Sequence, residues 1–574
     1  MHVMLLAALL AGTDAPPTQA WVARSNAIAQ QLLQQEATVS PEGVTELGIE
    51  GFDEAITNLA PGYEDRRRAL AKSEEALLVG RLASETDPQV KEDLKIMLDA
   101  VRRSGRGVDL EAQYLVPVHN VGEEVFSGIK TLLDDQIAPE RRKAALVRLR
   151  KYAGLEKGSQ PYASLARALT EEAMKNPKRQ MPSKAEIEKD LKAGPMELEG
   201  VGKLFQKYGI AGYEPSLAEL KKQAAAYDAW LKNDILPKAP ADFRLPPPVY
   251  AFALEAYGVT EPPAQLAADA HAAYDGLHKE MQALATEIAK ERHLPKSDFR
   301  DVLRELRKEQ LTETTILPHY QKRLAEIEAI IQREHLVTLP KRECRIRLAS
   351  EAESARMPAP HMDGPRLVNN HGEQGVFVLP VSNPVANGGD SRIDDFLNAS
   401  ASWGLAAHEA RPGHELQFAS MVERGVSQAR AIYAFNSANV EGWGLYSESI
   451  IAPYMSKEGQ LLALWMRSFR AARAFLDPEL QAGRITPEQA MKFLEEDTVC
   501  SHGLASEEVD RYTFQMPGQA TSYFFGYSQL RALRAEAEKQ QGKSFNAGRF
   551  HDLVLAQGAL PLGMLHDAVL AQLK

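Results

Sequence analysis

Residues 398–424 read NASASWGLAAHEARPGHELQFASMVER, and this stretch gives the clearest information on the fold and on the chemistry to expect. Its apolar residues recur at three- and four-residue spacing, which predicts a helix. Pro412 and Gly413 interrupt that helix between His408 and His414. Proline cannot donate to the His408 carbonyl and its ring would clash there, so the helix must open at this turn. Glycine accepts the unusual dihedral angles that such a bulge requires.

The opened turn bears on whether the two histidines can bind one metal ion. Zinc peptidases commonly place two histidines four residues apart on one helical face, with a glutamate beside the first. Here His408 and His414 are six residues apart, with Glu409 beside the first. On an unbroken helix six residues turn about 600°, which leaves the rings about 120° apart. A bulge that loops out two residues would return both rings to one side. The alternative is that they are ordinary polar residues at a kinked helix.

A third ligand is expected from the next helical stretch, where Glu441 follows His414 by 27 residues. Two imidazoles and one carboxylate, with a fourth position left for water, suit a catalytic zinc ion. Glu409 would then act as the general base on that water. Glu448 lies seven residues beyond Glu441 and is predicted to orient a ligand imidazole. The alternative for Glu409 and Glu441 is that both are solvated surface carboxylates.

Helical periodicity dominates the chain on both sides of this stretch. We predict one large helical domain over residues 21–574, with two lobes joined by the proline-rich connection near 237–248. A capping box at Thr486-Pro487-Glu488-Gln489 predicts a helix start. The clearest helical periodicity covers residues 21–35, 66–84, 88–103, 138–152, 162–175, 264–290, 320–334 and 427–454.

One segment departs from the helical pattern. Residues 357–395 contain ten glycines and prolines, and within them Val376-Phe377-Val378-Leu379 is typical of a strand. Because Pro380 and Pro384 follow directly, we predict an edge strand. An extended peptide can add to such an edge, so Val376, Phe377 and Val378 are candidate substrate contacts.

Composition excludes several classes of protein. The 574 residues carry a net charge of −11, with 44% hydrophobic and 25% charged residues. This is an ordinary globular composition, and no basic excess favours nucleic acid as a partner. The charge could steer cationic peptides towards the protein, but nothing in the sequence locates it. Two cysteines, Cys344 and Cys500, are too few for a disulfide framework and leave one disulfide as an open alternative.

The N-terminus carries an apolar run at residues 3–11 that is too short to cross a bilayer, and no apolar stretch of membrane-spanning length follows. Within residues 1–20 it resembles the hydrophobic part of an export signal, although no lysine or arginine precedes it. We favour export to the periplasm or the medium. The alternative is an apolar tail that packs on the body of a cytoplasmic protein.

Motifs spread along nearly the whole chain resemble those of the bacterial domain-of-unknown-function family 885, which is marked by His-Glu-x-x-Pro-Gly-His. That family is similar to the mostly helical gluzincin peptidases. The resemblance implies a large α-helical body with a deep cleft and a small edge sheet. It also implies zinc-dependent peptide hydrolysis, with His408, His414 and Glu441 as ligands and Glu409 as base. The stretches that carry it are 40–53, 408–414, 441–446, 511–523 and 550–562.

The motif at residues 511–523 supplies further candidates. A gluzincin mechanism needs a donor for the oxyanion of the tetrahedral intermediate, and Tyr523 is the first choice and Tyr512 the second. Both could instead be core aromatics. Arg511 could hold a substrate carboxylate, although pairing with a nearby glutamate is favoured. Gln519 belongs to the same motif and is a candidate neighbour of the substrate.

The sequence therefore predicts a monomeric zinc metallopeptidase that takes short peptides into a cleft between helical lobes. Two alternatives remain at this point. The same metal site could serve an amidase or esterase with a non-peptide substrate, or the chain could be a non-catalytic peptide-binding protein. An intact Glu409 argues against the latter, because a purely structural metal site needs no base.

Overall fold

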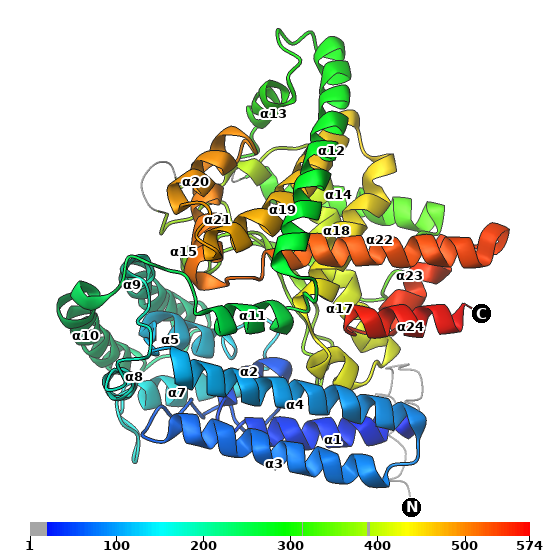
Figure 1. The fold of residues 1–574 in the computed structure, drawn as a ribbon. Helices are drawn as coiled ribbons and strands as arrows, with labels where there is room; N and C mark the ends of the chain where they lie inside the picture. The colour runs from blue at the N-terminus through cyan, green and yellow to red at the C-terminus, as the bar shows by residue number, and fades with distance from the viewer. Residues whose placement is uncertain (1–19, 313, 387–390, 574) are drawn as a thin grey trace, which may run out of the picture.

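Helices dominate the structure, a computed structural model that describes residues 20–312, 314–386 and 391–573 (Figure 1). The prediction of a mainly α-helical protein with one small sheet is confirmed. The export signal or tail predicted at residues 1–20 falls, except for Ala20, outside the described residues. None of the described helices combines the length and apolar character needed to cross a membrane.

The N-terminal helices form a layer along the bottom of Figure 1, where α1, α3 and α4 lie side by side. The start of α4 shows how local sequence sets these elements. Asp87 accepts hydrogen bonds from the backbone amides of Gln89 and Val90, and Pro88 occupies the first helical position. The layer comprises α1 (Ala20–Glu36), α2 (Pro41–Leu47), α3 (Tyr63–Ser84) and α4 (Pro88–Tyr114).

A group of helices beside this layer has an apolar core of its own, made of buried residues between Leu59 and Ile235 together with Ala352. Beyond this group, residues 237–248 lead to α11 and to a second, larger core. The group comprises α5 (Val121–Lys130), α6 (Pro139–Arg142), α7 (Ala144–Tyr152), α8 (Tyr162–Ala173), α9 (Lys184–Lys207), α10 (Glu214–Trp230), the π-helical turn η1 (Leu231–Ile235) and the 3₁₀ turn η2 (Leu236–Lys238).

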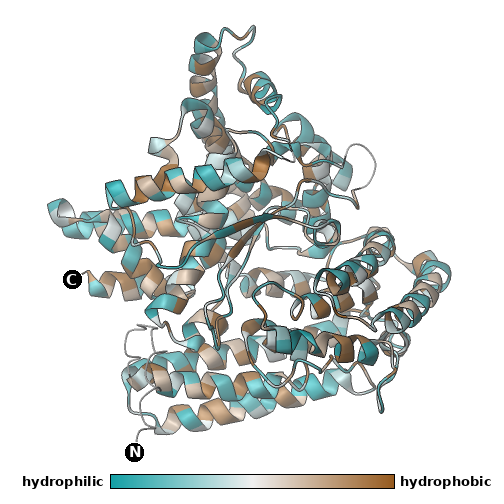
Figure 2. Cartoon of the chain, turned by 180° about the vertical axis from the view of Figure 1, so that it is seen from behind, coloured by the Kyte–Doolittle hydropathy of each residue, from teal (hydrophilic) through white to brown (hydrophobic). Residues whose placement is uncertain are grey.

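The larger core is built around long helices that follow residue 262, in which α12 packs along α19 and α18 packs along α22, and it also includes buried residues of α1, α3 and α4. Most helices in Figure 2 carry both hydrophilic and hydrophobic residues, as expected where one face is buried. The predicted capping box at Thr486 is confirmed at the start of α20. The helices of this part are α11 (Pro247–Ala256), α12 (Pro263–Glu291), α13 (Phe299–Arg307), α14 (Ile316–Glu334), α15 (Glu351–Arg356), α16 (Ser402–Leu405), α17 (His414–Arg424), α18 (Ser437–Ile451), α19 (Lys457–Gln481), α20 (Pro487–Glu496), α21 (His502–Asp510), α22 (Thr521–Gln541), α23 (Ala547–Ala556) and α24 (Leu562–Gln572).

Shorter turns connect several of these helices. They are the 3₁₀ turns η3 (Asp394–Phe396), η6 (Ala452–Tyr454) and η8 (Gly542–Ser544), and the π-helical turns η4 (Ala406–Ala410), η5 (Ala429–Tyr433) and η7 (Arg511–Gln515).

The sheet has three strands in the order β1-β3-β2, namely β1 (Arg345–Leu348), β2 (His361–Asp363) and β3 (Val376–Leu379). The prediction of Val376–Leu379 as an edge strand is wrong. This strand is central, paired in parallel with β1 and antiparallel with β2, and all four of its residues are buried. The prolines that suggested an edge follow the strand and do not enter its ladder. Cys344 and Cys500 are not paired.

Candidate metal centre and cavity

The interrupted helix brings the two histidines together as the sequence suggested. The π-helical turn η4 carries His408, Arg411 is extended, and α17 begins at His414. The peptide bond before Pro412 is cis. A Cβ atom on Gly413 would lie 1.8 Å from the carbonyl oxygen of His408, so only glycine fits at this close approach. The two imidazole rings end 4.7 Å apart between centroids.

Glu441 of α18 faces both rings. Its Oε2 lies 3.4 Å from Nε2 of His408 and 3.3 Å from Nε2 of His414. One candidate ligand atom from each of the three residues lies within 4.8 Å of the other two. Across the described ranges, no other set of three histidine, cysteine, aspartate or glutamate side chains comes together in this way. Two imidazole nitrogens and a carboxylate oxygen are a donor set that suits zinc.

Glu448 fixes the orientation of the first histidine. Its Oε1 lies 2.8 Å from Nδ1 of His408, and Arg470 approaches the same carboxylate at 3.7 Å. Because an ionised carboxylate only accepts hydrogen bonds, Nδ1 carries the proton and Nε2 presents its lone pair towards Glu441. Glu448 therefore occupies the orienting position that the sequence predicted for it.

Gly444, one turn beyond Glu441, leaves room for both imidazoles. A Cβ atom there would lie 2.6 Å from Cε1 of His408 and 2.9 Å from Cε1 of His414. Gly442 serves packing instead, because its Cβ would lie 2.5 Å from the backbone of Gly526 on α22. The two glycines therefore bring α18 against the histidines on one side and against α22 on the other.

Glu409 lines the same cavity as the three candidate ligands and is 6% exposed. Burial raises the pKa of its carboxyl to about 8. The His414 imidazole counteracts this rise, and the Glu441 carboxylate adds to it. A carboxylate with a raised pKa beside a candidate metal site can accept and return a proton.

Tyr523 and Tyr512 have different surroundings. Tyr523 lines the cavity, and its ring lies 6.2 Å from that of His408 and beneath the guanidinium of Arg473. Burial raises the pKa of its phenol to about 12, so its hydroxyl remains a donor. Tyr512 is fully buried outside the cavity lining, and its hydroxyl donates to Glu508 over 2.5 Å. The structure thus leaves Tyr523 as the oxyanion-donor candidate.

Arg511 and Gln519 connect the motif at residues 511–523 to the metal centre. Arg511 Nη2 donates to Glu507 over 2.6 Å, which is the pairing favoured from the sequence. Its Nη1 donates to Oε1 of Gln519 over 3.0 Å. The amide nitrogen of Gln519 then lies 3.4 Å from Oε1 of Glu441. These contacts give Gln519 and Arg511 a positioning role behind Glu441.

The cavity in front of these residues has a volume of about 600 Å³. Val376, Phe377 and Val378 do not line it, because they lie in the central strand. The edge strand β2 lines it instead through His361 and Met362. The remaining wall comes mainly from the segments 43–47, 357–367, 404–418, 431–441, 469–473 and 504–523.

Sequence reasoning missed two arginines of this wall, Arg470 and Arg473, which are 5% and 4% exposed. Arg467, Arg470 and Arg473 recur at three-residue spacing in the mostly apolar stretch 461–476, and this spacing is a signal that could have pointed to them. Arg473 forms a two-pronged ion pair with Glu508 while its guanidinium lies 4.4 Å from the centre of the Tyr523 ring. It thereby helps to position Tyr523.

Comparisons with known proteins agree on the fold and leave the chemistry open. The model of the family described as "Bacterial protein of unknown function (DUF885)" matches residues 41–569. Two solved structures, each of a "putative lipoprotein", are similar to this chain. That from Colwellia psychrerythraea has a TM-score of 0.78 at 19% identity and covers 96% of this chain and 99% of its own. That from Shewanella oneidensis, of unknown function, has a TM-score of 0.71 at 18% identity. It covers 96% of this chain and 100% of its own. No curated protein matches the chain.

Proposed function

The chain belongs to the bacterial protein family of unknown function DUF885, and we propose that it hydrolyses peptide bonds in short peptides with a bound zinc ion. One observation carries the proposal. Ligand atoms of His408, His414 and Glu441 converge within 4.8 Å on the wall of a cavity that Glu409 also lines. A purely structural metal site would need neither the cavity nor a buried carboxylate beside it.

The residues present fit a zinc ion. His408 and His414 would bind it through Nε2 and Glu441 through its carboxylate, and the lack of a side chain on Gly444 keeps this corner open for both rings. When bound, zinc supplies a Lewis acid that polarises a carbonyl group and lowers the pKa of water. Glu448 keeps the proton of His408 on Nδ1, so that Nε2 is free as a ligand.

The surrounding side chains support hydrolysis of an amide. Glu409 would accept a proton from the attacking water and return it to the leaving amine. Tyr523 would donate a hydrogen bond to the oxygen that becomes negatively charged during the attack. Arg473 and Glu508 hold the ring of Tyr523 in place from behind. Glu409, Arg473 and Tyr523 come from three separate segments, and all three line the cavity.

The shape of the cavity favours an extended, short peptide. Its volume of about 600 Å³ accommodates a few residues. Strand β2 stands at the edge of the sheet and lines the cavity, so a peptide could add to its free edge through backbone hydrogen bonds. This assigns to β2 the role that the sequence suggested for Val376–Val378.

We further propose that the protein is exported. The apolar run at residues 3–11 supports this, and so does the description of both similar structures as lipoproteins.

Metal analysis and a digest of a peptide library, with and without a chelator, test the function. The proposal expects about one zinc ion per chain and chelator-sensitive cleavage. Glu409→Gln should retain zinc and lose about 10²- to 10⁴-fold in kcat. Chelator-sensitive hydrolysis of amides or esters without peptide cleavage would support the alternative hydrolase. Full activity of Glu409→Gln, or purified protein that binds no metal, would contradict the mechanism.

A further inference from the structure

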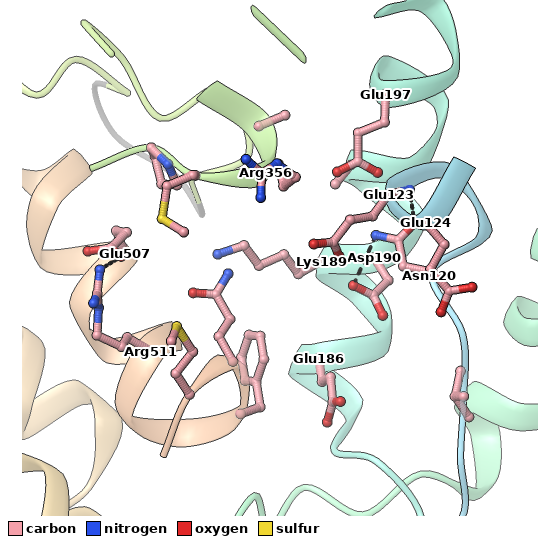
Figure 3. Close-up of a pocket in the computed structure, with 18 residues that line it drawn as sticks. Asn120, Glu123, Glu124, Glu186, Lys189, Asp190, Glu197, Arg356, Glu507 and Arg511 are labelled. Carbon is pink, nitrogen blue, oxygen red and sulfur yellow. Dashed lines mark hydrogen bonds and ion pairs between the residues drawn. The ribbon is translucent and has the colours of Figure 1, made fainter. Parts of the chain in front are cut away.

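A second cavity of about 330 Å³ adjoins the metal-centre cavity (Figure 3). On one side α5 and α9 line it, and on the other α15, α21 and η7. Met357, Arg511 and Met516 line both cavities. The two cavities therefore adjoin at these side chains, and we call the second space the acidic subsite.

The acidic subsite has an excess of carboxylates without cationic partners. Glu123, Asp190 and Glu197 line it, and none of them forms an ion pair with any described residue. The nearby cations Lys189 and Arg511 form ion pairs with other carboxylates. Lys189 pairs with Asp510 over 2.7 Å and Arg511 with Glu507 over 2.6 Å.

Three cationic residues line this space, and Arg356 alone of them has no carboxylate partner within ion-pair distance among the described residues. Figure 3 shows its guanidinium on one side of the space and the carboxylates of Glu123, Asp190 and Glu197 on the other. Three acidic side chains therefore face one guanidinium that forms no ion pair. Acidic side chains therefore outnumber the available cationic groups of this space, and the described part of the protein supplies no ion-pair partner for Glu123, Asp190 or Glu197. A cation that enters the space would favour the ionised form of these side chains.

Glu197 is the side chain of this space that points most clearly to a cationic ligand. It is 1% exposed, its Oε2 has no hydrogen-bond partner, and its carboxylate is directed into the cavity in Figure 3. Burial, together with the neighbouring carboxylates of Glu123 and Asp190, raises the pKa of Glu197 to about 8. Burying a carboxylate without a partner costs free energy, which a cationic ligand would recover.

The spacing of these carboxylates does not suit a bare metal ion. Within the part of the chain that the structure describes, His408, His414 and Glu441 alone meet the criterion of three ligand atoms within 4.8 Å. Carboxylates spread around a cavity instead suit a cation with several N–H donors in different directions. Guanidinium and ammonium groups have this property.

We propose that the acidic subsite binds a positively charged organic group of the substrate, namely the side chain of an arginine or lysine or the free amino terminus of a peptide. The assignment to a peptide substrate rests on the proposed function, whereas the binding of the cation does not. The subsite lies behind Arg511, whose neighbour Gln519 contacts Glu441. It would thus select the residue that flanks the bond to be cleaved.

Binding of four small probes tests the cation subsite without any turnover. Argininamide carries both positive groups, Nα-acetyl-argininamide only the guanidinium, citrullinamide only the ammonium, and Nα-acetyl-citrullinamide neither. Calorimetric titration of the full chain should show at least about tenfold weaker binding of the neutral probe, which corresponds to about 1.4 kcal/mol. The two singly charged probes then identify which cation the subsite prefers.

Variants locate the effect. Glu197→Gln and Asp190→Asn should each remove most of the difference between charged and neutral probes. Glu188→Gln changes an exposed residue of the same helix, α9, and should leave the difference between charged and neutral probes unchanged. Thermal unfolding gives a second readout, because removing an uncompensated buried carboxylate should stabilise the ligand-free protein. Equal binding of all four probes, no binding of any, or an undiminished difference in Glu197→Gln would overturn the proposal.

Hydrolysis separates this inference from the proposed function. If peptides are cleaved, those with arginine next to the scissile bond should show at least about tenfold higher kcat/KM than those with citrulline, and Glu197→Gln should abolish the preference. Probe binding without any peptide cleavage would retain the subsite and reject the peptidase. Cleavage with no preference for charge, together with equal probe binding, would retain the peptidase and reject the subsite.

Discussion

Replacing Gly444 by alanine is expected to damage the metal centre while leaving the fold intact. The added Cβ would lie 2.6 Å from Cε1 and 2.7 Å from Nε2 of His408. Carbon atoms in contact normally stay about 3.5 Å apart, so the ring and the helix must separate by about 0.9 Å. Zinc ligands keep their bond lengths within about 0.2 Å. The displacement is therefore several times larger than the site tolerates.

The size of the effect follows from these two lengths. We expect zinc to bind about 100-fold or more weakly, at or beyond the upper end of the losses caused by changes next to metal ligands. Alanine is a better helix former than glycine by about 1 kcal/mol, so the loss of room is partly offset in the stability of α18. The unfolding temperature of the metal-free protein should therefore change little.

Competition with a zinc-binding dye measures the affinity, and thermal unfolding of metal-free protein monitors the fold. Gly276→Ala in α12 is the matched control, because no atom lies within 4 Å of its new Cβ. Gly442→Ala provides a contrast, since its Cβ would meet the backbone of Gly526 and should destabilise the packing of α18 on α22. A folded Gly444→Ala protein that binds zinc as tightly as the parent would refute the reasoning.

Three further predictions address neighbouring groups. Glu448→Gln should weaken zinc binding about tenfold in the same dye titration, because a neutral amide holds the Nδ1 proton of the imidazole less strongly. Unchanged zinc affinity would show that Glu448 does not orient the imidazole. Tyr523→Phe should lower kcat about 10²-fold, whereas Tyr512→Phe should mainly lower the unfolding temperature. Steady-state kinetics and melting curves measure the two effects, and a larger loss of kcat in Tyr512→Phe than in Tyr523→Phe would contradict the assignment. Because the pKa of Glu197 is raised from 4.5 to about 8 on folding, the folded protein holds a proton that the unfolded chain releases, and stability should fall between those two pH values. Glu197→Gln should remove up to about 5 kcal/mol of this loss, and parallel pH profiles of unfolding for the two proteins would contradict it.

Local sequence was sufficient to predict many of the helices, although not α9, α19 or α22, and to identify the residues that converge at the metal centre. Periodicity and capping signals act within a few residues, so the start of α20 at Pro487 could be read directly. The break at Pro412-Gly413 was equally local, because the ring of proline and the close approach of Gly413 to the His408 carbonyl are properties of one turn. The role of Tyr512 was harder to predict, since its partner Glu508 lies in an adjoining helical turn and both are buried.

Strand order was not available from the sequence. Prolines after Val376–Leu379 suggested an edge, but the order β1-β3-β2 depends on which segments pair, and those pairings join residues far apart in the chain. The edge strands are therefore β1 and β2, and the cavity wall includes β2 and not β3. Arg470 and Arg473 were missed for the same reason, because their burial depends on the packing of α19 against other helices, which local sequence does not show.

The sequence by itself determined the chemical nature of the candidate centre: two histidines, two glutamates and the turn that orients them. It also determined a net charge of −11, without saying where that charge acts. Only the tertiary structure placed Glu123 of α5 and Asp190 and Glu197 of α9 together, beside the cavity of the metal centre. The physical reason is that ligand geometry at a helical turn is set by neighbouring residues, whereas a local excess of charge arises from segments that meet only when the chain has folded.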